Sequence, residues 1–438
     1  MTPTDERRLH EVFRPYARFD LGLKAALAER VRHGLVSSQV RYEYLSHLAT
    51  WNGLAEPGST KVGAEAFLQT LAGLVESFSR ERRFTAPPIR VSPDGLLQNG
   101  VHRLAAALAC GVEPTIEVVE GPAANYDCFY FFRFTSPLGQ TRFTRRSLIH
   151  MLYRNVTLWR DRIRTAIVFP RGHARDAGAR AAEAIAEQGV LLWDETISVP
   201  GAFLKYLVLN AYPGEPWTGV GSAKDGVGRK TASVVTMPSG PHALRVLVFV
   251  PHADADVTAL KQEIRNFYGM GNDALHISSG PYDSFSLATA FCSSVSDLSP
   301  LQHLAYSSPR LAEVLALAKT LSTQSPHIER CMLVGSAALE LYGGRPANDL
   351  DFVGAGLPTI DQAYTGHNAY AYLYETEIAD LVDSLEGRFF FGGLPAAAPG
   401  MVLGFKERRN EHKDRLDVAQ MRGIFANRGG ASRPTSPT

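Results

Sequence analysis

The segment Met332–Val353, MLVGSAALELYGGRPANDLDFV, decides how the C-terminal part of the chain is interpreted. It has the pattern of an apolar strand that ends at Gly335-Ser336, a short helix, and a second strand that contains two aspartates. Because strand side chains alternate between two faces, Asp349 and Asp351 are expected to project on the same side, roughly 6.6 Å apart along the strand. Two carboxylates aimed together repel each other, and a divalent cation would relieve that repulsion.

These residue types predict a metal-dependent nucleotide site. Ligation by oxygen atoms alone suits Mg²⁺ or Mn²⁺ held by carboxylates and by substrate phosphates. The Gly335-Ser336 turn, at the start of a helix, would offer backbone N–H groups and a hydroxyl to the phosphates of a nucleoside triphosphate. Together these are the parts of metal-assisted nucleotidyl transfer.

The arrangement of Gly335, Ser336, Asp349 and Asp351 resembles the polymerase-β-like nucleotidyltransferase superfamily, whose signature is a Gly-Ser pair followed by Asp-x-Asp in a strand. The resemblance implies that the two aspartates are catalytic and hold the metal. It also implies a third carboxylate from a later part of the sheet, for which Asp380, with Asp383 close by, is the nearest candidate.

The downstream segment Phe405–Gln420, FKERRNEHKDRLDVAQ, resembles the basic helix ending in Lys-Asp-x-x-Asp that closes many small nucleotidyltransferase domains. This implies that Lys406 and Lys413 meet triphosphate charge, while Asp414 and Asp417 fix the helix. The alternative is that the Asp-x-Asp is a turn at a strand edge and the basic run is a solvated helix face.

A second motif lies in Gln98–Val119, QNGVHRLAAALACGVEPTIEVV. Its alanines would let a helix pack tightly on a strand, while Arg103 at the helix N-terminus addresses an anion. The segment resembles the ParB/sulfiredoxin-like fold, in which a Gly-x-His-Arg turn binds nucleotide phosphate, and Gly100, His102 and Arg103 match that turn. The alternative is a well-packed helix with an exposed His-Arg pair.

The ParB-like resemblance leaves the chemistry of this domain open. Sulfiredoxin activity needs a cysteine where this chain has Val101, so it is not expected. Phosphoryl transfer would need a carboxylate base, and Glu43 and Glu56 are the upstream candidates.

The 438 residues suggest about three domains. We predict a multidomain α/β (α+β) protein with a ParB/sulfiredoxin-like strand–helix unit and a helical N-terminal part at 1–135. An α/β domain of unknown role is expected at 136–305, a nucleotidyltransferase-like mixed sheet at 306–425, and a disordered tail at 426–438.

Periodicity along the chain predicts the individual elements. We expect the aromatic run 126–134 to be a buried strand and the arginine-rich stretch 142–164 to be a solvated helix face. Other helices are expected near 21–32, 65–78, 102–110, 174–187, 256–267 and 310–321, and strands near 89–91, 115–119, 166–169, 190–192 and 244–250.

Loops in the middle of the chain are also candidates for ligand contact, because they follow predicted strands. They include Tyr212–Trp217 and Ala274–Ser279. The side chains that would hold a phosphorylated substrate there are Lys224, Lys230, Arg265 and His276, although a lone histidine is more often a hydrogen-bonded structural residue.

Composition narrows the classes of function. Lys and Arg number 45 against 44 Asp and Glu, so nucleic acid is a conceivable partner that the net charge of +1 does not support. Four cysteines without metal-ligand spacing argue against a zinc site and a disulfide scaffold. The chain shows no signal peptide and no membrane-spanning apolar run, so we expect a cytoplasmic protein without a membrane partner.

Two hypotheses remain. The first is a Mg²⁺-dependent nucleotidyltransferase or phosphotransferase acting on a sugar, a small hydroxyl compound or a macromolecular hydroxyl, with a second phosphate-ligand site in the N-terminal domain. The second is a nucleotide-sensing or nucleic-acid-associated binding protein with a ParB-like switch and an inactive transferase domain. A third carboxylate facing Asp349 and Asp351 would favour the first.

Overall fold

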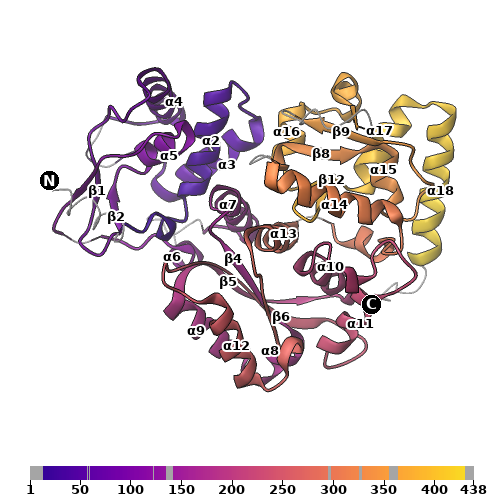
Figure 1. Cartoon of the computed structure of the whole chain (residues 1–438). Helices are drawn as coiled ribbons and strands as arrows, with labels where there is room; N and C mark the ends of the chain where they lie inside the picture. The colour runs from indigo at the N-terminus through magenta and orange to yellow at the C-terminus, as the bar shows by residue number, and fades with distance from the viewer. Residues whose placement is uncertain are drawn as a thin grey trace, which may run out of the picture. The chain divides into compact units, whose positions relative to one another are not determined.

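A computed structural model of the chain describes residues 13–134, 142–293, 297–324, 328–354 and 364–429, with single-residue gaps at 57, 59 and 122 (Figure 1). The fold is mixed α/β and divides into two compact units. The first comprises Met1–Ile163, Ala182–Glu195 and Leu247–Asp256, and the second comprises Arg164–Ala181, Thr196–Val246 and Val257–Thr438.

The first unit is a group of helices around a three-stranded sheet of order β2-β1-β3. Strand β1 pairs antiparallel with β2 and parallel with β3. The elements are η1 Pro15–Ala17, α2 Leu21–His33, α3 Ser38–Asn52, α4 Ala64–Glu81, β1 Ile89–Val91, β2 Leu97–Asn99, α5 Val101–Cys110, β3 Ile116–Val118, α6 Cys128–Arg133 and α7 Arg145–Leu158.

Helix α5 packs tightly, as its alanines predict, but mainly against helices and not against the predicted strand. It is preceded by Gly100 (φ +103°) and followed by Gly111 (φ +66°), both in the left-handed region that favours glycine. Ala105–Ala107 are fully buried, and α5 packs against α2 and α4. A small-faced helix therefore fixes the position of the turn at Gly100.

A four-stranded sheet of order β5-β6-β4-β7 follows in the chain. The succession strand, helices, strand, strand, helix, strand is that of a split β-α-β unit, with an insertion between β5 and β6. The elements are β4 Arg164–Val168, α8 Pro170–Asp176, α9 Ala179–Gln188, β5 Gly189–Val199, α10 Gly201–Ala211, η2 Pro216–Thr218, α11 Gly226–Val234, β6 His242–Pro251, α12 Val257–Tyr268, η3 Gly271–Asp273, β7 Leu275–Ile277 and α13 Pro281–Cys292.

The C-terminal sheet is mixed, with the order β10-β9-β8-β12-β11. Figure 1 labels β9, β8 and β12 in this sheet. Its central strand β8 is buried throughout. The elements are η5 Ser299–His303, α14 Pro309–Gln324, η6 Ile328–Arg330, β8 Cys331–Val334, α15 Gly335–Glu340, β9 Leu350–Gly354, β10 Tyr364–Gly366, η7 Asn368–Tyr374, α16 Ile378–Asp383, β11 Arg388–Phe391, β12 Leu394–Ala397, α17 Pro399–Arg409 and α18 His412–Gly429.

Helix α10 is hydrogen-bonded to the edge strand β11 of this sheet. The Tyr206 hydroxyl donates to the carbonyl oxygen of Phe390 (2.7 Å) and accepts from the N–H of the same residue (2.9 Å). The side-chain oxygen of Asn210 accepts from the N–H of Gly392 (3.0 Å). The outer edge of the C-terminal sheet is thus partly satisfied by side chains from the middle of the chain.

The predicted strand at 126–134 is wrong, because most of this run forms helix α6. The Asp127 carboxylate caps the helix by accepting from the N–H of Tyr130 (2.8 Å). Helical spacing also brings the rings of Tyr130 and Phe134 to 5.4 Å from each other. A continuous aromatic run has no clear period, so periodicity alone did not separate helix from strand.

The predicted solvated face at 142–164 is only partly confirmed, because Arg142, Arg145 and Arg146 are exposed but every residue from Leu148 to Val156 in α7 is buried. His150 and Arg154 are buried because Glu43 on α3 binds both. The Glu43 carboxylate lies 2.7 Å from Nδ1 of His150 and accepts from Arg154 at 2.8 and 3.1 Å. Arg154 of this arginine-rich stretch is therefore part of a buried ion cluster.

Most of the other predicted elements are confirmed, but β5 extends well beyond the predicted strand 190–192, and the loop predicted at 274–279 contains strand β7. The helix predicted at 174–187 is divided into α8 and α9, because Ala177 and Gly178 both have positive φ. Helix α18 reaches Gly429, four residues into the tail predicted as disordered from 426, and 430–438 lie outside the described residues.

Glu43 gives the protein a specific acid sensitivity. Burial alone would raise the pKa of Glu43, but Arg154 and His150 outweigh it and lower the pKa from 4.5 to about 2. A depressed carboxyl pKa stabilises the fold above pH 4.5, and this contribution, about 3 kcal/mol, is lost as the pH falls from 4.5 towards 2. Thermal unfolding followed across this range should show a steep loss in the natural chain and a flatter profile in Glu43→Gln. Equal slopes would contradict the assignment.

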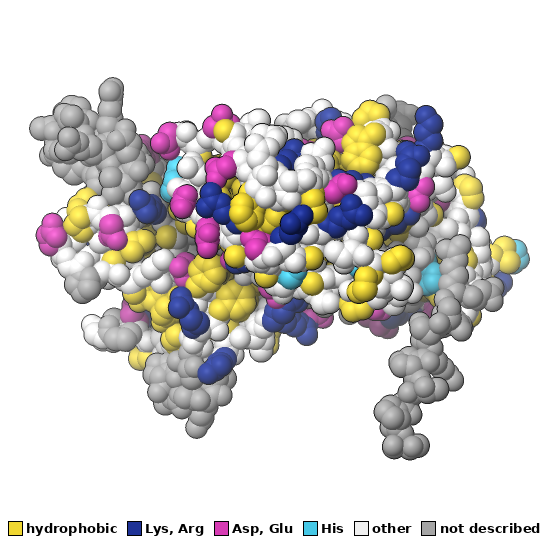
Figure 2. Space-filling model, turned by 90° about the horizontal axis from the view of Figure 1, so that it is seen from below, with side chains coloured by type: hydrophobic (Ala, Val, Ile, Leu, Met, Phe, Trp, Pro, Cys, Tyr) yellow, Lys and Arg dark blue, Asp and Glu magenta, His cyan; other side chains and the backbone are white. Residues whose placement is uncertain are grey.

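The surface mixes charges of both signs. Figure 2 shows one face on which Lys and Arg side chains are interspersed with Asp and Glu side chains, in keeping with their near-equal numbers. Within the ranges that the structure describes, no helix combines the length and apolar character needed to cross a membrane.

Candidate functional site

The turn between β8 and α15 places a backbone and a carboxylate against each other. Val334, the last residue of β8, lies opposite Asp351 of β9 in the antiparallel pair. Gly335 follows with φ +67°, and a Cβ atom added to it would collide with the Asp351 carboxylate. Glycine is therefore required here both by its conformation and by the close approach of Asp351.

The two aspartates of the motif affect each other, as the sequence predicts. Asp349 is exposed just before β9, outside the strand that was predicted to contain it, and Asp351 is partly buried on the strand. Burial is the largest influence on Asp351 and raises its pKa. His367 opposes this effect, and the charge of Asp349 adds to it. The pair thus carries the like-charge repulsion that a cation would relieve.

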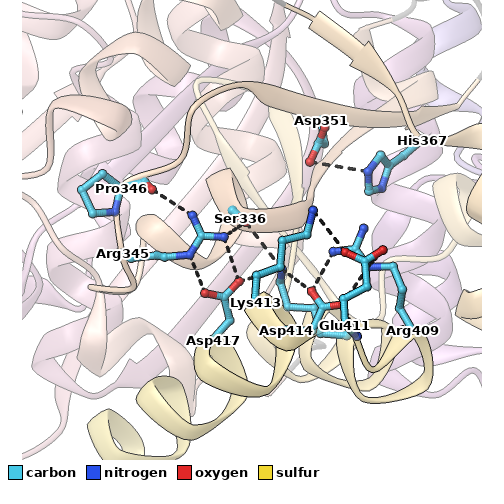
Figure 3. A network of polar contacts seen from close by, with 11 residues as sticks. Ser336, Arg345, Pro346, Asp351, His367, Arg409, Glu411, Lys413, Asp414 and Asp417 are labelled. Carbon is cyan, nitrogen blue, oxygen red and sulfur yellow. Dashed lines mark hydrogen bonds and ion pairs between the residues drawn. The ribbon is translucent and has the colours of Figure 1, made fainter.

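His367 is a site residue that the sequence reasoning missed. It follows the short strand β10, which pairs parallel with β9, and its Nε2 lies 3.5 Å from Oδ2 of Asp351 (Figure 3). Burial lowers the pKa of His367 below its usual value. A three-residue strand with no apolar alternation gave no signal for this contact.

Ser336 lies at the centre of a basic group (Figure 3). Its hydroxyl oxygen accepts from Arg345 Nη2 at 3.2 Å and from Lys406 Nζ at 3.5 Å. Arg345 is a second residue that the sequence reasoning missed, because the loop between α15 and β9 has no helical or strand periodicity. The loop and α17 together bring two cations to the hydroxyl.

Two aspartates of α18 hold these cations in place. Lys406 is buried and lies 3.2 Å from Asp414 and 2.8 Å from Asp417. Asp417 also accepts from Arg345 at 2.6 Å, and Asp414 from Arg409 at 2.7 and 2.8 Å (Figure 3). Asp414 and Asp417 therefore connect α18 to α17 and to the loop before β9 by ion pairs.

Lys413 lies at the margin of this network and joins it through Glu411, which pairs with Arg409 at 3.7 Å (Figure 3). Lys413 is exposed and pairs with Glu411 at 3.2 Å. Asp380 lies half-buried on α16 and is not among the charges that shift the pKa of Asp351. Across the described ranges, no three His, Cys, Asp or Glu side chains gather as a metal site.

Two carboxylates that disfavour each other's charge would nevertheless suit a magnesium ion. Mg²⁺ commonly keeps several waters and is held through one or two carboxylates plus substrate phosphates. The raised pKa of Asp351 also indicates a carboxylate whose charged form lacks full compensation within the chain.

In the first unit, the predicted turn lines a cavity of about 680 Å³. Gly100 and His102 face this cavity, and Glu56, but not Glu43, lies on its wall. Arg103 does not line it, because its guanidinium donates to the carbonyl oxygens of Pro87 and Pro88 at 2.5 and 2.8 Å. The turn is present, but the predicted arginine supports the backbone.

His102 is held as a neutral group beside the cavity. Its Nε2 lies 2.9 Å from the Tyr44 hydroxyl. Burial is the largest of the influences that lower the pKa of His102 well below 6.5, and Lys24 adds to it.

Arg18 and Lys24 supply the positive charge of this cavity and were not predicted. Both are buried, and both pair with the single buried carboxylate of Asp20, the Arg18 bond measuring 2.6 Å. The Arg18 guanidinium also lies over the rings of Tyr126 (4.1 Å) and Trp51 (4.9 Å). Burial is the main cause that lowers the pKa of Lys24 to about 8. The Glu56 carboxylate on the same wall also acts on Lys24 and pairs with Lys61 at 2.6 Å, so the five side chains Arg18, Lys24, Lys61, Asp20 and Glu56 carry a net charge of +1.

No family model matches the chain, and searches among curated proteins and among solved structures find no match. Its function is therefore inferred from the chemistry of these two sites.

Proposed function

We propose that the β8–α15–β9 site performs metal-dependent nucleotidyl or phosphoryl transfer to a hydroxyl acceptor. One observation carries the proposal: the Asp351 carboxylate lies against Gly335, one residue from a hydroxyl that accepts from two cations. Acidic and basic groups thus flank a single turn. A phosphate that carries a metal ion needs both kinds of group, because carboxylates hold the metal and cations contact the phosphate oxygens.

Each residue has a role that follows from its position. Asp349 and Asp351 would hold Mg²⁺ or Mn²⁺, which supplies charge neutralisation at the phosphates when bound. Ser336, Arg345 and Lys406 would donate to phosphate oxygens. Asp417 holds Arg345, and Asp414 and Asp417 hold Lys406, so these two cations are already positioned.

His367 is a positioning residue in this proposal. Its imidazole lies 3.5 Å from the Asp351 carboxylate and limits where that carboxylate points. We assign it no proton transfer.

The cavity at Gly100 would be the second phosphate-ligand site. Its support is the buried pair Arg18 and Lys24, whose charge Asp20 only half compensates. An anion held there would meet a forked guanidinium and a lysine in a desolvated setting. The alternative function, a nucleotide-binding switch without catalysis, rests on this same cavity.

The deciding experiment incubates the full chain with each labelled nucleoside triphosphate, Mg²⁺ or Mn²⁺, and a panel of hydroxyl acceptors. Pyrophosphate release indicates nucleotidyl transfer, and nucleoside diphosphate release indicates phosphoryl transfer. Binding without either product would support the switch and reject catalysis.

Substitutions of Arg18 and Arg103 distinguish two ways in which the N-terminal domain could bind a phosphate. Arg18→Gln should weaken ATP binding at least roughly tenfold, because it removes a charge-assisted donor from the cavity wall. Arg103→Gln should change affinity little, since its guanidinium is bound to Pro87 and Pro88. Fluorescence of Trp51, which lines the cavity, reports binding, and Trp51→Phe identifies its signal. A larger effect from Arg103→Gln would place the ligand outside the cavity.

A further inference from the structure

The second unit contains a pocket that the proposed function does not use. It has a volume of about 310 Å³ and shares no lining residue with the β8–α15–β9 site. Its walls come from the loop after α10, from α12, from β7 and from the start of α13. The residues that bear on its chemistry are Tyr212, Trp217, Lys261, Arg265, His276 and Asp283.

One wall carries two cations a single helical turn apart on α12. Lys261 Nζ donates to the carbonyl oxygen of Ile277 at 2.6 Å, and Arg265 reaches that of Leu275 at 3.4 Å. Among the residues that the structure describes, neither forms an ion pair with a carboxylate. Burial lowers the pKa of Lys261 to about 8, and the charge of Arg265 adds to this effect. The charge of Asp283, which lines the same pocket, opposes these effects, so the two cations have a carboxylate near them but no direct ion pair.

The pocket is also lined by a buried histidine with unused hydrogen-bonding capacity. His276 on β7 is 4% exposed, and neither ring nitrogen has a partner among the described residues. Burial first, and then the neighbouring cations, lower its pKa well below 6.5, so the imidazole is neutral with one donor and one acceptor. An unpaired buried polar group lowers the stability of the fold. The simplest explanation for the unpaired nitrogens of His276 is that a ligand in the pocket supplies the missing partner.

The remaining walls suit a hydroxylated ring. The Trp217 ring is 42% exposed and lies edge-on to Tyr212, with 4.9 Å between centroids, and Tyr212 lies 4.5 Å from His276 in the same way. Asp283 accepts from Ser279 at 2.8 Å and has further acceptor capacity for ligand hydroxyls, as has Glu215.

We propose that this pocket binds a small phosphomonoester of a hydroxylated compound, such as a sugar phosphate. The phosphate would lie between Lys261 and Arg265, since a phosphomonoester carries about −1.5 to −2 charges and matches two cations better than a carboxylate does. The ring would lie against Trp217 and Tyr212, with its hydroxyls near His276 and Asp283.

The test titrates the full chain with glucose 6-phosphate and follows tryptophan fluorescence. The natural chain should respond at millimolar concentration or below, and the response should vanish in Trp217→Phe. Lys261→Gln and Arg265→Gln should each weaken binding at least roughly tenfold, because each removes a charge-assisted donor. Arg265→Lys, which keeps the charge, should retain part of the affinity.

Matched controls exclude a general charge effect. Lys319→Gln on α14 and Arg229→Gln on α11 remove exposed cations of the same unit and should leave the affinity unchanged. Glucose and glucuronate, which lack the phosphate, should bind at least tenfold more weakly, and inorganic phosphate should compete. A response that survives Trp217→Phe, equal binding of glucuronate, or unchanged affinity in both glutamine variants would overturn the proposal.

Discussion

Asp351→Asn is expected to lower nucleoside triphosphate turnover by roughly two to three orders of magnitude, because it removes a metal-binding charge while keeping the shape of the side chain. Asp349→Asn should act in the same direction. The substitution at Asp351 should not lower the unfolding temperature, since burial and the charge of Asp349 already disfavour its carboxylate.

The combination of lost turnover and kept stability distinguishes a catalytic carboxylate from a structural one. Steady-state turnover with Mg²⁺ and thermal unfolding are measured on the same preparation, with the exposed Asp254→Asn as the matched control. Turnover equal to that of the natural chain in both Asp349→Asn and Asp351→Asn would reject the transferase proposal.

Lys406→Met is expected to reduce the free energy of unfolding by about 3 kcal/mol. Lys406 is buried between Asp414 and Asp417, and removal of one partner of a buried ion pair leaves uncompensated charge. Arg345 and Arg409 still contact the same aspartates, which keeps the loss at the lower end of the range for buried pairs.

The matched control for this prediction lies seven positions further along the chain. Lys413 is exposed, so Lys413→Met should change the free energy by less than about 0.5 kcal/mol. Urea unfolding of both variants gives the comparison. Equal midpoints would show that Lys406 does not stabilise the fold.

The parts of the candidate site that the sequence predicted are those set by local rules. Strand alternation and turn chemistry were enough for Gly335, Ser336 and Asp351, because each lies within a few residues of the strand end that positions it. Lys406 and its aspartates were predictable because adjacent helices connected by a short turn pack side by side.

The parts that were missed depend on sheet order or on unpatterned loops. His367 reaches Asp351 only because β10 pairs beside β9, and Arg345 lies on a loop. The packing of α2 on α5 brings Arg18 and Lys24 to the same cavity as Gly100, and no residue spacing in the sequence indicates this packing. The prediction of a strand at 126–134 was wrong for another reason, because a continuous aromatic run fits both the helical and the strand period.

The hydrogen bonds from α10 to β11 limit how the C-terminal part can be exchanged between proteins. Tyr206 reaches Phe390 across 184 positions of the chain, and Asn210 reaches Gly392 across 182. A gene segment that encoded only the C-terminal sheet and its helices would lose these partners and leave a strand edge available for pairing with other chains. The segment is therefore poorly suited to shuffling as a module, and would have to be inherited together with the helix that completes it.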